Sequence, residues 1–136
     1  MADRRPTVLV VDDHSDLRDA LVVLLEHEGY RVADASNGAE ALDYLRSDEP
    51  VHALIVDRDM PVMNGWEFLA ECRLHPTRRT IPTLVFTGVS IAERRRDELG
   101  SLPVFTKPVN FDHLLAALRR AMIRGIDPDA PGGQAH

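Results

Sequence analysis

The sequence is short of cysteine, of long apolar runs and of basic charge. Its one cysteine, Cys72, cannot form an internal disulfide bond. The longest apolar run, residues 20–25, is far shorter than the ~20 residues that a membrane helix needs, and the N-terminus has no signal-peptide core. These absences favour a cytoplasmic protein without membrane insertion. The 22 acidic residues exceed the 16 basic ones, and this net charge of −6 argues against direct nucleic-acid binding.

Length and composition predict one soluble domain. The 136 residues are 44% hydrophobic and 28% charged, which is typical of a globular protein and leaves no room for two full domains. After Arg124 the chain becomes rich in proline and glycine and loses its apolar periodicity. We therefore expect a domain over residues 1–125 and a disordered tail over residues 126–136.

Five short runs of apolar residues predict five strands. Three of the runs are almost continuously apolar, which is typical of a parallel sheet covered on both faces. The predicted strands cover residues 7–11, 31–35, 53–56, 83–86 and 104–106.

Helical patterns follow these strands. Leucine and alanine side chains recur at helical spacing between Ser15, the predicted N-cap, and Gly29, the predicted stop. Asn37 and Asn64 each precede a glutamate by three residues and are predicted to begin two further helices.

Two more helices complete a repeating β-α order. Residues 90–99 carry few apolar side chains and predict the least firmly packed helix, whereas residues 111–122 carry a clear apolar stripe. Five β-α units imply an α/β fold, (βα)5, with a doubly wound parallel sheet between two helical layers. The expected strand order is 2-1-3-4-5.

Polar residues follow four of the five predicted strands. Ligands of open parallel sheets bind beyond the carboxyl ends of the strands. Strands one and three are neighbours in the expected order, so their terminal carboxylates should lie together. The residues at the strand ends are Asp12 and Asp13, Asp57, Thr87, and Lys107.

These side chains suit phosphoryl transfer to an aspartate. Two carboxylates 4 Å apart repel by about 4 kcal/mol at an effective dielectric constant of about 20, so a cation such as Mg²⁺ is expected among them. Lys107, the only lysine, can pair its ammonium group with a phosphoryl oxygen, and the Thr87 hydroxyl can donate a hydrogen bond to another. Each residue alone has a structural interpretation as a helix cap, turn or surface residue. Their common position favours a shared site.

Four segments of the sequence resemble the receiver domain of two-component response regulators. They are VLVVDD at residues 8–13, LIVDRDMPVMNG at 54–65, VFTG at 85–88 and FTKP at 105–108. The resemblance extends over residues 6–125 and implies the flavodoxin-like α/β/α fold.

The resemblance implies a role for each site residue. Asp57 matches the phosphoacceptor, which takes a phosphoryl group from a sensor histidine kinase or a histidine phosphotransfer protein. Asp12, Asp13, Asp57 and the main-chain carbonyl of Asp59 match the Mg²⁺ ligands. Thr87 and Lys107 match the residues that contact the phosphoryl group. A receiver acts on itself and is not a turnover enzyme.

One position departs from the family pattern. Receivers usually carry an aromatic residue three positions before the lysine, where this chain has Val104. Phe105 should point the other way, into the core, because strand side chains alternate. The departure affects the face of residues 90–99, 104–106 and 111–122, where receivers commonly meet downstream proteins.

Two alternatives to a stand-alone phosphorylated receiver stay open. The first is an adaptor that keeps the fold and works without phosphorylation, which Val104 favours. The second is a haloacid-dehalogenase-type phosphatase, because Asp57 and Asp59 form a DxD pair with Thr87 and Lys107 downstream.

Overall fold

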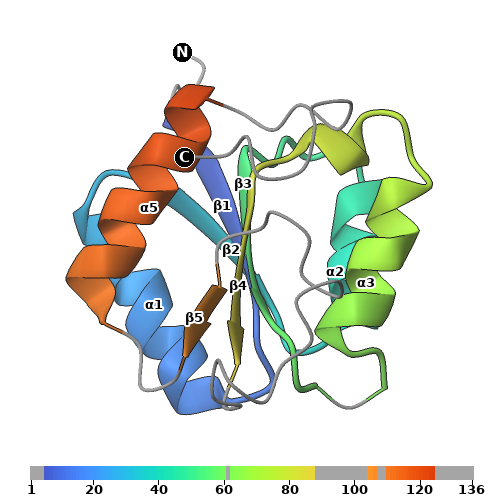
Figure 1. Cartoon of the computed structure of the whole chain (residues 1–136), viewed down its shortest axis with the longest axis horizontal. Coiled ribbons are helices and arrows are strands. Elements are labelled where there is room, and N and C mark those ends of the chain that lie inside the picture. The colour runs from blue at the N-terminus through green and yellow to red at the C-terminus, as the bar shows by residue number, and fades with distance from the viewer. Residues whose placement is uncertain (1–4, 61, 88–103, 107–109, 125–136) are drawn as a thin grey trace.

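The computed structural model describes residues 5–60, 62–87, 104–106 and 110–124, and in these ranges strands alternate with helices (Figure 1). The strands are β1 (Thr7–Val11), β2 (Arg31–Ala35), β3 (Ala53–Asp57), β4 (Thr83–Thr87) and β5 (Val104–Thr106). The helices are α1 (Ser15–His27), α2 (Gly38–Arg46), α3 (Gly65–Arg73) and α5 (Phe111–Arg124), with a 3-10 turn η1 (Arg78–Thr80).

All strand pairs in the sheet are parallel, and the order β2-β1-β3-β4-β5 confirms the predicted topology. Asp57 pairs with Phe86, and Thr87 pairs with Thr106. β3 and β4 each extend one residue beyond the predicted end, so that Asp57 and Thr87 are the last residues of their strands. Both side chains are therefore held by the sheet itself.

Helices cover both faces of the sheet, as the apolar strands predict. α1 and α5 lie on one side, and α2 and α3 lie on the other (Figure 1). Strand side chains alternate between the two resulting cores. The core under α1 and α5 contains Val8, Val10, Ile55, Leu84 and Phe86, and the core under α2 and α3 contains Leu9, Val11, Leu54, Val56 and Val85.

Cys72 belongs to the core under α2 and α3. It is 3% exposed, and this burial raises the pKa of its thiol to about 11. The thiol therefore stays neutral at physiological pH and acts as a small apolar group.

The helix ends confirm most of the predicted signals. Asn37 Oδ1 accepts a hydrogen bond from the Glu40 backbone N–H at 2.9 Å. Asn64 forms a complete capping box with Glu67, and Gly29 has a φ of 98° just beyond α1.

The predicted cap at Ser15 is wrong. Ser15 is the first residue of α1, and His14 holds the N-cap position without a side-chain capping bond among the described residues. Asp12, two residues before the N-cap, stabilises the turn instead, because its Oδ1 accepts a hydrogen bond from the backbone N–H of His14 at 2.9 Å. A site residue thus replaces the serine in ordering this turn.

Several predictions concern residues outside the described ranges: the helix over 90–99, Lys107 and the tail over 126–136. The side chain of Val104 is also outside them. Phe105 is half-buried and packs against the core under α1 and α5, which confirms its expected direction. No helix in the described ranges is long and apolar enough to cross a bilayer.

Candidate functional site: an acidic cluster at the carboxyl edge of the sheet

Three carboxylates meet where β1 and β3 end. Asp12, Asp13 and Asp57 each offer an oxygen, and these oxygens all lie within 4.8 Å of one another. Asp12 and Asp57 have no exposed surface, whereas Asp13 is exposed. The structure thus brings together the residues that the sequence predicted as neighbours, and it leaves the cluster open to solvent on the Asp13 side.

One carboxylate oxygen of Asp12 has no hydrogen-bond partner among the described residues. Its backbone N–H donates to the Ala35 carbonyl at 3.0 Å, and its Oδ1 accepts from the His14 backbone. Its Oδ2 is buried and has no hydrogen-bond partner in the part of the chain that is described. A buried carboxylate oxygen beside two further carboxylates fits a hard cation with oxygen ligands, such as Mg²⁺.

The loop after β3 holds Asp57 by backbone contacts. The Arg58 backbone donates to the Phe86 carbonyl at 2.9 Å, and the Gly65 backbone donates to the Arg58 carbonyl at 3.0 Å. A Cβ on Gly65 would lie 2.6 Å from the Asp57 carbonyl oxygen. Only glycine lets α3 begin this close to the end of β3.

The Asp59 carboxylate contacts the Thr87 side chain. Thr87 Oγ1 donates to Asp59 Oδ2 at 3.2 Å, and the Asp59 backbone donates to Asp57 Oδ1 at 3.0 Å. Thr87 is 1% exposed, so its side chain is buried at the carboxyl end of β4. The sequence interpretation assigned the main-chain carbonyl of Asp59 to the metal and its side chain to the DxD alternative, but it did not predict the contact of this side chain with Thr87.

Arg18 of α1 is a second residue that the sequence interpretation missed. Its Nη1 donates to the Asp12 main-chain carbonyl at 2.7 Å, and its Nε lies 3.1 Å from Asp34 Oδ2. Its position on the polar side of an amphipathic helix predicts only a solvated charge, so no sequence signal pointed to this contact.

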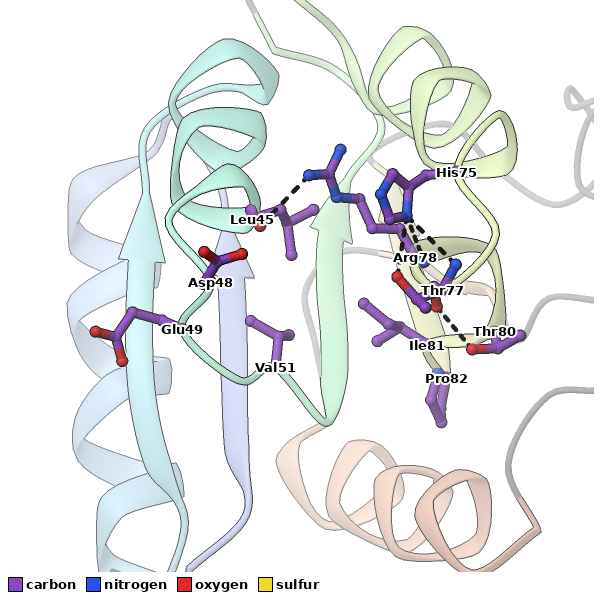
Figure 2. Close-up of a pocket in the computed structure, with 10 residues that line it drawn as sticks. All are labelled: Leu45, Asp48, Glu49, Val51, His75, Thr77, Arg78, Thr80, Ile81 and Pro82. Atoms are coloured by element: carbon purple, nitrogen blue, oxygen red, sulfur yellow. Dashed lines mark hydrogen bonds between the residues drawn. The ribbon is translucent and has the colours of Figure 1, made fainter.

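A cavity of about 410 Å³ lies at the opposite edge of the sheet, between the loops that precede β3 and β4. Figure 2 shows Asp48 and Glu49 on one side and His75 and Arg78 on the other. The guanidinium of Arg78 donates to the Leu45 carbonyl at 3.5 Å and links η1 to α2. None of the three clustered aspartates lines this cavity, so the acidic cluster is a separate site.

Comparison with known proteins identifies the family. The model of the response regulator receiver domain matches residues 8–119. The chain therefore belongs to the response regulator receiver family, in which an aspartate site accepts the phosphoryl group and the usual partners are histidine kinases.

Curated relatives cover different lengths. An uncharacterized 14.6 kDa protein of Leptolyngbya boryana is 36% identical over 90% of this chain and 94% of its own length. The response regulator MprA of Mycolicibacterium vanbaalenii is 37% identical over 94% of this chain. The chain spans only 54% of that regulator, about half its length.

Solved structures show the same fold. The chemotaxis protein CheY4 of Vibrio cholerae has a TM-score of 0.77 and 32% identity, covering 85% of this chain and 98% of its own. A putative response regulator of Chloroflexus aurantiacus has a TM-score of 0.79 and 30% identity, covering 89% of this chain and all of its own.

Proposed function

We propose that this chain is a stand-alone receiver, with its domain over residues 1–125, that accepts a phosphoryl group on Asp57. The observation that carries the proposal is the carboxylate cluster, in which buried Asp57 lies close to Asp12, whose Oδ2 has no hydrogen-bond partner among the described residues. A cation bound among these three carboxylates would reduce their mutual repulsion, and the same cation can also bind phosphate oxygens. The match to the receiver family over residues 8–119 favours this reaction over the phosphatase alternative.

The reaction assigns a role to each residue. A carboxylate oxygen of Asp57 attacks the phosphorus of a phosphohistidine, the P–N bond breaks, and the freed imidazole nitrogen takes up a proton. Asp12, Asp13, Asp57 and the Asp59 main-chain carbonyl would hold Mg²⁺, and the bound cation would neutralise charge on the phosphoryl oxygens. Thr87 donates a hydrogen bond to one phosphoryl oxygen.

Lys107 supplies the remaining positive charge in this proposal. It directly follows β5, which pairs with β4 beside Thr87. The donor would be a sensor histidine kinase or a histidine phosphotransfer protein in the cytoplasm. The signal would leave through the face of residues 90–99, β5 and α5, or by onward phosphotransfer.

Labelling by acetyl phosphate tests this proposal. We expect the wild-type protein to take up one hydroxylamine-sensitive phosphoryl group with Mg²⁺ and none with EDTA, because the clustered carboxylates need the cation. Asp57→Asn should abolish labelling. Asp48→Asn is the matched control, because Asp48 lines the cavity at the opposite edge of the sheet.

Three other outcomes would contradict the proposal. Equal labelling of wild type and Asp57→Asn would exclude Asp57 as the acceptor. A folded wild-type protein that takes up no phosphoryl group would support the adaptor. Release of many equivalents of phosphate from a small phosphate ester would support the phosphatase.

A further inference from the structure

Arg18 joins three elements at the acidic edge of the sheet. It projects from α1, contacts the Asp12 carbonyl just after β1, and pairs with Asp34 near the end of β2. The Arg18 side chain is only 18% exposed, whereas that of Asp34 is 48% exposed. The guanidinium is held by these two contacts, because its planar group can donate to both acceptors at once.

This contact is one of three hydrogen bonds that Asp12 makes with described residues. The backbone N–H donates to Ala35, the main-chain carbonyl accepts from Arg18, and Oδ1 accepts from the His14 backbone. Of the polar atoms of Asp12, Oδ2 alone has no partner within the described residues. The surrounding contacts fix the rotation of the carboxylate and leave this oxygen available to the cluster with Asp13 and Asp57.

We propose that Arg18 is a positioning residue that orients Asp12 for cation binding. The inference rests on the proposed Mg²⁺ site. Arg18 acts through the main chain of Asp12 and does not itself touch the cation. Removing groups that orient metal ligands typically weakens metal binding by 10- to 100-fold.

A purely electrostatic role predicts the opposite sign. Arg18 is a cation near three carboxylates, and a positive charge there disfavours Mg²⁺. If Arg18 acted only through its charge, its removal would strengthen Mg²⁺ binding. If Arg18 served only the stability of the fold, its removal would leave the Mg²⁺ affinity of the folded protein unchanged. The direction of the change therefore separates the three roles.

Titration of the full chain with Mg²⁺ alone, by calorimetry well below the unfolding temperature, tests the inference. We expect Arg18→Met to weaken Mg²⁺ binding about tenfold. Arg18→Lys keeps the charge but loses the planar fork, so its affinity should fall between those of wild type and Arg18→Met. An unchanged or tighter affinity in Arg18→Met overturns the inference.

Asp34→Asn is the matched control. It removes the charge of the second Arg18 partner and leaves an oxygen acceptor, so the contact with Asp12 persists. We expect its Mg²⁺ affinity to stay within about twofold of wild type, because a half-exposed charge is strongly screened. If Arg18→Met does not fold, a wild-type affinity in Arg18→Lys contradicts the inference.

The outcomes also separate this inference from the proposed function. Loss of Mg²⁺ binding by the wild-type protein would overturn both. Normal binding by wild type, with no weakening in the Arg18 variants, would overturn only the positioning role and leave Asp57 as the proposed acceptor.

Discussion

At the scale of single residues, the contact between Thr87 and Asp59 holds the hydroxyl that the proposed reaction needs. Thr87 Oγ1 donates to the Asp59 carboxylate, which also lies 3.9 Å from the guanidinium of Arg58. A hydroxyl has one proton to donate, so it cannot serve Asp59 and a phosphoryl oxygen at once. The unphosphorylated arrangement therefore competes with the phosphorylated one.

Removing the Asp59 carboxylate should favour the phosphorylated arrangement. Asp59→Ala removes the carboxylate that competes for the Thr87 hydroxyl, and a hydrogen bond worth about 1 kcal/mol predicts roughly fivefold tighter binding of beryllofluoride with Mg²⁺. The affinity is measured by amide chemical shifts during titration with this phosphoryl mimic. In a Thr87→Val background the same substitution should change little.

Asp59→Asn distinguishes competition from charge. Asparagine keeps an oxygen that accepts from Thr87, so competition predicts a smaller gain than for Asp59→Ala. If charge repulsion alone limited binding, Asp59→Asn and Asp59→Ala would behave alike, and the Thr87 background would make no difference.

At the scale of elements, the close approach of α3 to β3 positions Asp57. The sequence showed Gly65 in a segment typical of the family, and the structure supplies the physical reason. A Cβ there would meet main-chain atoms of Asp57 and Arg58, which cannot move aside as a flexible side chain can.

Gly65→Ala should therefore disturb both stability and the site. We expect it to lower the free energy of unfolding by about 2–3 kcal/mol through overpacking. It should also slow phosphoryl labelling, because the strain falls on the backbone of Asp57. Denaturant unfolding and labelling rates at a temperature where the variant is folded measure the two effects.

Gly29→Ala is the matched control for this prediction. Gly29 has a positive φ of 98°, but a Cβ added there would meet no atom within 4 Å, so alanine strains only the local backbone. We expect a loss of about 1–2 kcal/mol with normal labelling. If both variants label at the wild-type rate, the close approach at Gly65 does not position Asp57.

Helix ends show where local sequence signals suffice. The signals at Asn37 and Asn64 depend on residues three positions apart, and both predictions are confirmed. The signal at Ser15 failed because Asp12, whose side chain serves the site, also closes the turn before α1. Local capping rules do not predict that a residue of the acidic cluster also accepts the hydrogen bond at the start of α1.

At the scale of the whole molecule, the topology could be predicted because apolar runs and helical stripes alternate along the chain. The parallel order then places Asp12, Asp13 and Asp57 at one edge. The contacts of Arg18 with Asp34 and of Thr87 with Asp59 could not be predicted, because they join residues 16 and 28 positions apart and depend on side-chain rotamers.

The most direct test of phosphoryl transfer to Asp57 is chemical mapping of the phosphorylated residue. Borohydride reduces the acyl phosphate of an aspartate to homoserine, which peptide mass spectrometry locates in the chain. After labelling with acetyl phosphate and Mg²⁺, we predict homoserine at position 57 alone. Homoserine at position 12 or 13, or a labelled protein in which Asp57 is unchanged, would contradict the account.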